Sequence, residues 1–200
     1  MPYPTDYRTP REGITLPDGQ VIRAERLSYG GYYDRDQLAS SVTAGFQTQY
    51  FLRANAVTSR LETNVTTAGR IGTGYFEVQS LGVHVYEPGS TPVTASDLGM
   101  IINGSLVRFL KDGQELFELP CFMFQAGVGI SGQTTATGTS LVTNGVPSKG
   151  LVPSLPFSID LFDTSTFEVD ITYPAALTLS TATIFVEVIL EGIRAVVLSG

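Results

Sequence analysis

Strict alternation of apolar and polar side chains is the clearest pattern in this chain, and it is most regular over residues 167–173. There Phe167 and Val169 share a face with the apolar residues that follow, while Glu168 and Asp170 point the other way. Such alternation predicts a half-buried antiparallel strand. Clusters of β-branched and aromatic residues predict further strands. These lie at 46–52, 75–85, 106–110, 115–119, 156–162 and 184–190, with 193–198 extending or flanking the last.

The strand predicted at 75–85 changes parity part-way along. Its apolar positions are even-numbered up to Val78 and odd-numbered from Leu81 onward. Because side chains alternate between the two faces of a sheet, one inserted residue is needed to keep both halves facing the core. A β-bulge is therefore predicted near Ser80 or Gly82.

Turn and capping residues separate these segments. Lys111-Asp112-Gly113 joins two strand candidates and predicts a type I turn closed by a glycine bulge. Thr94, followed three residues later by Asp97, has the pattern of a helix start. Residues 98–102 would add one or two turns, and no other helix of note is expected.

Two segments lack this periodicity. Residues 1–45 are rich in Pro, Gly, Tyr and Arg, and we expect an extended arm there, lying over a larger body. Within it, the turn Pro17-Asp18-Gly19 predicts a hairpin between residues 14–16 and 21–22. Residues 127–150 carry almost no charge and few large side chains, which predicts a long exposed loop.

The composition favours an all-β fold. Charged residues make up 16% of the chain, and 21 Gly and 11 Pro divide it at short intervals. A length of 200 residues with 42% hydrophobic content is enough for one core. We therefore expect an N-terminal arm over residues 1–45. Residues 46–200 would form an antiparallel, eight-stranded jelly-roll β-sandwich with at most one short helix.

The net charge of −7 is unevenly distributed. Residues 1–60 carry +1, with seven Arg, and the rest of the chain carries −8. An acidic body repels phosphate backbones, so we expect no direct nucleic-acid binding by the main domain. The seven Arg either pair with the acidic residues among them or contact an anionic partner.

The N-terminal sequence MPYPTDYRTPREG has neither the basic nor the apolar region of a signal peptide. No apolar run approaches the roughly 20 residues needed to cross a bilayer. We therefore expect synthesis in a cytoplasm and at most peripheral contact with a membrane.

The sequence offers little material for catalysis. His84 lies between two valines of a predicted strand and has no partner at metal-ligand spacing. Cys121 lies in the apolar run LPCFMF, which predicts a buried, unreactive thiol. We expect a non-enzymatic protein with no catalytic residue, cofactor or metal. A Cys121–His84 nucleophile pair and a two-carboxylate glycosidase remain as alternatives.

Two stretches of the chain resemble jelly-roll coat proteins of phages. The first is the run from Glu62 to Ile71 followed by Tyr75 to Val83. The second is the closing pattern of 167–171, Leu177 and 184–192. The resemblance covers about residues 60–200. It implies a single jelly roll of the kind found in tailless phages related to the adenovirus-like lineage, whose subunits form oligomeric capsomers and carry no active site.

We accordingly expect a structural subunit of a virus capsid or virion surface. Its partners would be further copies of itself and other virion proteins. The alternative is a carbohydrate- or receptor-binding jelly-roll module, which the absence of Trp disfavours, and a hydrolase on the same sandwich ranks third. Aromatic and Arg residues of the expected arm are the type enriched at interfaces. The predicted assembly contacts are Tyr3, Tyr7, Arg8, Arg11, Tyr29, Tyr32 and Tyr33.

Overall fold

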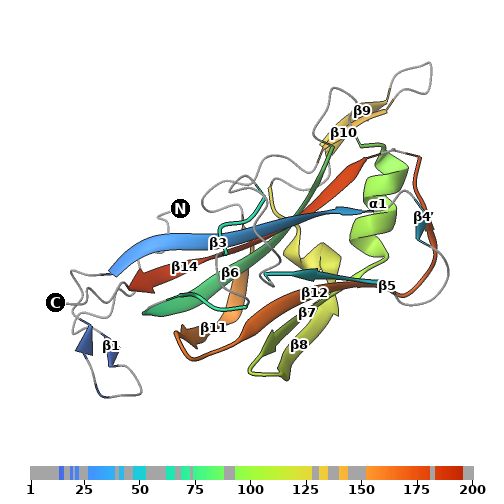
Figure 1. The fold of residues 1–200 in the computed structure, drawn as a ribbon. Helices are drawn as coiled ribbons and strands as arrows, with labels where there is room; N and C mark the ends of the chain where they lie inside the picture. The colour runs from blue at the N-terminus through green and yellow to red at the C-terminus, as the bar shows by residue number, and fades with distance from the viewer. Residues whose placement is uncertain are drawn as a thin grey trace.

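The computed structural model is built mainly of antiparallel strands (Figure 1). It describes residues 14–15, 19, 21–22, 27–38, 41–42, 47–52, 62–65, 69–72, 74–87, 93–127, 131–134, 140–143, 152–180 and 183–195. None of the helices in these ranges is both long and apolar enough to span a membrane.

Two four-stranded antiparallel sheets carry the fold. The first sheet has the order β11-β6-β14-β3, and the second has the order β5-β12-β7-β8. The bounds in the first sheet are β3 Leu27–Leu38, β6 Tyr75–Tyr86, β11 Ser154–Phe162 and β14 Ile184–Ala195. Those in the second are β5 Gln47–Phe51, β7 Leu106–Lys111, β8 Gln114–Pro120 and β12 Phe167–Tyr173. The strands predicted at 167–173 and 184–190 are confirmed, and the latter continues to Ala195.

Shorter strands form three further antiparallel pairs among the described residues. They are β1 Ile14–Thr15 with β2 Val21–Ile22, β4 Ser41–Val42 with β13 Leu177–Thr178, and β9 Ser131–Thr134 with β10 Ser140–Thr143. The first pair confirms the predicted N-terminal hairpin. The last corrects the prediction of a continuous loop over 127–150, because paired strands satisfy backbone hydrogen bonds without needing large side chains.

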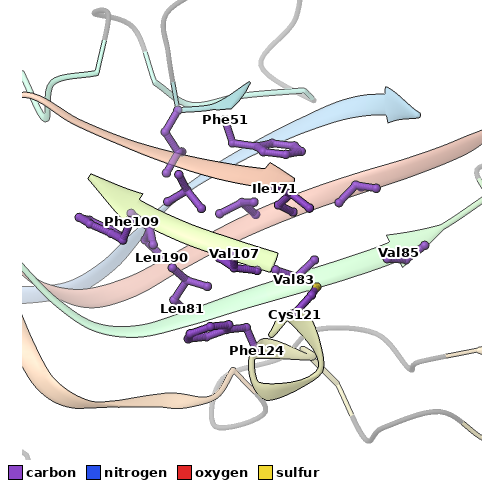
Figure 2. Close-up of a cluster of buried hydrophobic side chains, with 14 of the residues drawn as sticks. Phe51, Leu81, Val83, Val85, Val107, Phe109, Cys121, Phe124, Ile171 and Leu190 are labelled. Atoms are coloured by element: carbon purple, nitrogen blue, oxygen red, sulfur yellow. The ribbon is translucent and has the colours of Figure 1, made fainter. Parts of the chain in front are cut away.

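One hydrophobic core joins the two sheets (Figure 2). Figure 2 shows Phe51, Val107, Phe109 and Ile171 of the second sheet gathered against Leu81, Val83 and Leu190 of the first. The alternation predicted from the sequence therefore serves a core between two sheets, each burying one face. This is a sandwich-like arrangement.

Strand β3 corrects the expected boundary between arm and body. Residues 27–38 pair with β14 along their whole length, with Leu38 opposite Ile184 and Leu27 opposite Ala195. They therefore belong to the first sheet and not to an extended arm over residues 1–45. The two sheets take seven strands from the region after Phe46 and one, β3, from before it.

The predicted bulge in β6 is confirmed. Glu191 of β14 pairs with Ser80, and the next residue, Gly192, pairs with Val78. Gln79 of β6 has no partner in this register and is the inserted residue. At the bulge the backbone of Gly192 lies close to that of Glu77, and Gly192 has no side chain to obstruct this contact. A Cβ there would lie 1.8 Å from the carbonyl oxygen of Glu77.

The turn between β7 and β8 differs from the prediction. Asp112 and Gly113 both have positive φ, at 51° and 75°, and Lys111 pairs with Gln114. Two central residues with positive φ indicate a type I′ turn, whose twist matches that of the flanking strands, and not a type I turn. The register does shift in this hairpin, but beyond the turn, next to Leu116.

Helix α1 (Ala95–Asn103) begins as predicted. Thr94 is its N-cap, and the Thr94 side chain accepts a hydrogen bond from the Asp97 backbone N–H at 3.2 Å. Leu98, Ile101 and Ile102 point into the core. The helix thus covers one end of the space between the sheets (Figure 1).

Candidate functional site

The predicted assembly contacts differ in how far the structure exposes them. Tyr29 is 41% exposed, and its hydroxyl donates to Glu191 at 2.7 Å. Tyr33 is half-buried on the edge strand β3, and its backbone bonds with Asn64. Tyr3, Tyr7, Arg8 and Arg11 lie outside the described residues. Of the three predicted contacts that lie among the described residues, Tyr29 is accessible and Tyr33 is partly so.

Tyr32 is a core residue, which corrects its prediction as an assembly contact. Its ring packs edge-on against Phe76 at 5.0 Å, and its hydroxyl donates to the Ile71 carbonyl at 2.7 Å. Burial raises the pKa of this phenol, and nearby Arg194 opposes the rise. Tyr32 therefore holds residues 69–72 against the sheet and is not available to a partner.

Two carboxylates, the half-buried Asp34 and the exposed Asp36, link the edge strands β3 and β5. Asp34 accepts a hydrogen bond from the Leu52 N–H at 2.6 Å, and Asp36 accepts one from the Gln49 side chain at 3.3 Å. Gln49 in turn accepts from the buried Tyr173 hydroxyl at 2.8 Å. Burial raises the pKa of Asp34 to about 6. Asp36 adds to the rise, and hydrogen bonds from Leu52 and Thr63 oppose it.

Backbone bonds cover the outer edge of β3. The Arg35 N–H donates to the Glu62 carbonyl at 3.0 Å, and the Asn64 N–H donates to the Tyr33 carbonyl at 3.2 Å. Edge strands in native sheets are commonly protected by such cover and by inward-pointing charges. The backbone cover by residues 62 and 64 makes this edge a poor candidate for pairing with another chain.

Two further buried carboxylates also serve the fold. Asp97 accepts hydrogen bonds from the Ser180 backbone N–H and hydroxyl, at 3.0 and 2.9 Å, which ties α1 to the segment after β13. Asp170, on the outer face of the second sheet, is fully buried and accepts a hydrogen bond from Arg108 of the neighbouring strand. Both carboxylates hold elements of the chain together.

The contacts of His84 and Cys121, the two residues considered for catalysis, indicate structural roles. His84 stacks on Tyr86 at 5.0 Å, and its Nδ1 lies 3.4 Å from a Glu187 oxygen. Cys121 is fully buried, and burial raises the pKa of its thiol to about 11. Such a thiol is almost entirely protonated at neutral pH, which does not suit a nucleophile. Within the described ranges, no three His, Cys, Asp or Glu residues are placed to share a metal ion.

Exposed apolar side chains lie on β11 and in the 3₁₀ turn that follows β8, and these two strands are edge strands of the two sheets. Phe117 of β8 contacts Phe157 of β11 at 6.3 Å between ring centroids. It also stacks on the buried Phe124 of the 3₁₀ turn η2 (Cys121–Phe124) at 5.6 Å. Phe122, Met123 and Phe157 are 54%, 50% and 50% exposed.

The sequence did not reveal that Phe122, Met123 and Phe157 are exposed. The apolar run LPCFMF does not indicate which of its side chains are exposed, whereas the 3₁₀ turn places residues three apart on the same side. Cys121 and Phe124 are consequently buried, while Phe122 and Met123 face outward. Phe157 is exposed because β11 loses register with β6 between Ser154 and Ile159. Neither effect leaves a signal in the apolar pattern.

Compared with known proteins, the chain matches no protein-family model and no curated protein sequence.

Proposed function

We propose that the chain is a structural subunit of a virus capsid or virion surface, built on a jelly-roll sandwich and assembling through contacts with its own copies. The observation that carries this proposal is the order in which the main strands pair. The outermost strands β3 and β14 pair, then β5 with β12, β6 with β11, and β7 with β8.

These pairs are nested, and they alternate between the two sheets. β3–β14 and β6–β11 lie in the first sheet, and β5–β12 and β7–β8 lie in the second. A long antiparallel ribbon rolled around a core would produce this order, which supports the proposal of a jelly roll. Viral capsid domains are among the main users of this architecture.

Because a fold does not decide a function, the proposal also draws on the side chains. The carboxylates of the half-buried Asp34 and the buried Asp97 and Asp170 hold strands and the helix together, as a structural protein requires. Phe122, Met123 and Phe157 expose apolar surface of the kind that subunits bury on association.

The mass of the full chain in solution tests the proposal. Light scattering after size-exclusion chromatography, with electron microscopy of the same fractions, should detect defined oligomers or larger assemblies. A chain that stays monomeric at every concentration would contradict the proposal. If that monomer bound immobilised glycans, the carbohydrate-binding alternative would replace it.

A further inference from the structure

We infer that the seam between the edge strands β3 and β5 is a clasp that closes on protonation. The clasp consists of Asp34 and Asp36 of β3, Gln49 of β5, Leu52 directly after β5, and Thr63. It helps to hold the two sheets together while Asp34 carries a proton, and it loosens when both carboxylates are ionised. The inference goes beyond the proposed function and does not depend on it.

Side chains make the clasp, because β3 and β5 belong to different sheets. Asp34 accepts a hydrogen bond from the Leu52 N–H at 2.6 Å, and Asp36 accepts one from the Gln49 side chain at 3.3 Å. The buried Gln49 in turn accepts from the Tyr173 hydroxyl of β12. The hydrogen bonds of two carboxylates thus cross from the first sheet to the second, on the side of the molecule where β3 and β5 approach each other (Figure 1).

The clasp holds Leu52 in a strained conformation. Its φ of 63° lies in the left-handed region, which residues other than Gly rarely adopt. Asp34 binds its N–H, the Gly69 N–H donates to its carbonyl at 3.1 Å, and its side chain is fully buried. Such strain persists only where the surroundings over-determine it, so relaxation of Leu52 favours opening of the clasp.

Asp34 and Asp36 lie close together without a positive charge between them. They are two residues apart on β3 and so project from the same face. In the described part of the chain, their hydrogen bonds come from neutral groups. Arg35 lies between them in the sequence but on the opposite face, where its side chain donates to the Tyr86 hydroxyl at 2.9 Å. Two ionised carboxylates placed in this way repel each other, and one proton removes the repulsion.

The other titratable groups around Asp34 do not reverse this balance. Glu62, in the segment that bonds to the edge of β3, is a further acid. Burial raises the pKa of the Tyr173 phenol, which therefore stays neutral. Strand β14 presents an apolar residue opposite Asp34. Burial and the charge of Asp36 raise the pKa of Asp34 to about 6, and they outweigh the hydrogen bonds that favour the ionised carboxylate.

The clasp controls access to one edge of the first sheet. The backbone of residues 62–64 covers the edge of β3 through hydrogen bonds to that strand. Thr63 of this segment bonds to Asp34 through its side chain, and Leu52 at the end of β5 bonds to the same carboxylate. One carboxylate therefore holds both the cover of the edge and the neighbouring strand. When the clasp loosens, backbone groups along this edge of β3 become available for pairing.

Hydrogen exchange of the full chain, measured over a series of pH values and corrected for the intrinsic rate of each amide, tests the inference. Protection of residues 49–52 and 62–65 should fall by about 20-fold between pH 4.5 and 7.5. This is the change expected for a carboxyl group whose pKa returns from about 6 to 3.8 on opening. At pH 7.5 these amides should exchange faster than those of the central strand β14, which shows that the opening is local. Amides of β8, at the opposite edge of the second sheet from β5, should keep the same protection at each pH.

The same measurement on Asp34→Asn and Asp36→Asn separates the roles of the two carboxylates. D34N cannot ionise, so protection of residues 49–52 should not change with pH. D36N removes the repelling charge, so the fall should be smaller and lie at lower pH. Asp163→Asn, in an exposed turn, is the matched control and should behave as the wild type. Protection at the seam that ignores pH in the wild type, falls equally in D34N, or never drops below that of β14 would overturn the inference and leave the proposed function standing.

Discussion

At the scale of single residues, Asp34 combines a structural role with sensitivity to pH. The folded protein binds a proton at Asp34 more tightly than the unfolded chain does, since the pKa is raised from 3.8 to about 6. The contribution of this group to stability is therefore full below pH of about 4 and is lost as the pH rises through about 6.

We predict that replacing Asp34 with Asn will flatten the pH dependence of stability. Asn keeps an acceptor for the Leu52 N–H and cannot ionise. The melting temperature of the wild type, relative to D34N, should fall as the pH is raised from 4.5 to 7.5. Asp163→Asn, in an exposed turn, is the control and should follow the wild type. Parallel curves for wild type and D34N would contradict the prediction.

A second prediction at this scale concerns Cys121. Because its thiol is buried and its pKa is raised to about 11, it should not react with an aromatic disulfide reagent in native protein at pH 8, and should react at once after denaturation. Glu118→Cys, which adds an exposed thiol, provides the reactive control. Cys121→Ala should cost about 1 kcal/mol through a small cavity. Rapid native labelling of Cys121 would show that this part of the core opens readily.

At the scale of elements, the carboxylate of Asp97 ties helix α1 to the segment after β13. Asp97→Ala would leave the Ser180 N–H without its buried acceptor, and we expect a loss of about 2–3 kcal/mol in the free energy of unfolding. Urea denaturation measures this loss. Ser96→Ala, at an exposed position of the same helical turn, should change stability by no more than about 0.5 kcal/mol. Equal effects of the two changes would refute the role of Asp97.

Gly192 and Gly30 give a matched pair of tests for the bulge. They face each other across β14 and β3, but only Gly192 is crowded. A Cβ at Gly192 meets the Glu77 carbonyl, whereas at Gly30 its nearest neighbour is 3.7 Å away. We therefore expect Gly192→Ala to cost more than about 3 kcal/mol or to prevent folding, and Gly30→Ala to stay within about 1 kcal/mol. Thermal melting of both variants checks this.

The elements differ in how far the sequence predicts them. Strand β12 is predicted to the residue because Phe167 to Tyr173 alternate without exception. Strand β3 is missed because Asp34 and Asp36 take inward positions between the buried Tyr32 and Leu38. A polar network replaces the apolar face there, and alternation cannot detect it. Phe122, Met123 and Phe157 are missed for the opposite reason, since they are apolar like core residues but are exposed.

At the scale of the whole molecule, the position of β3 changes what a truncation should do. We predict that deleting residues 1–26 leaves both four-stranded sheets folded, because β3 begins at Leu27. Deleting residues 1–38 removes β3, exposes one edge of β14 and uncovers Val188 and Leu190, so we expect insoluble or unfolded protein. Soluble yield and far-UV circular dichroism distinguish the two. A well-folded 39–200 fragment would show that β3 is dispensable.

Strand β14 also determines when the first sheet can form. It lies between β3 and β6 in the sheet, and both of these partner strands are synthesised long before β14. Contacts between such distant parts of a chain give a high contact order, and proteins of this kind fold in milliseconds to seconds, far more slowly than helical bundles. On the ribosome, one edge of both β3 and β6 would stay unpaired until residues 184–195 emerge, and nascent chains that stall before that point should be the aggregation-prone species.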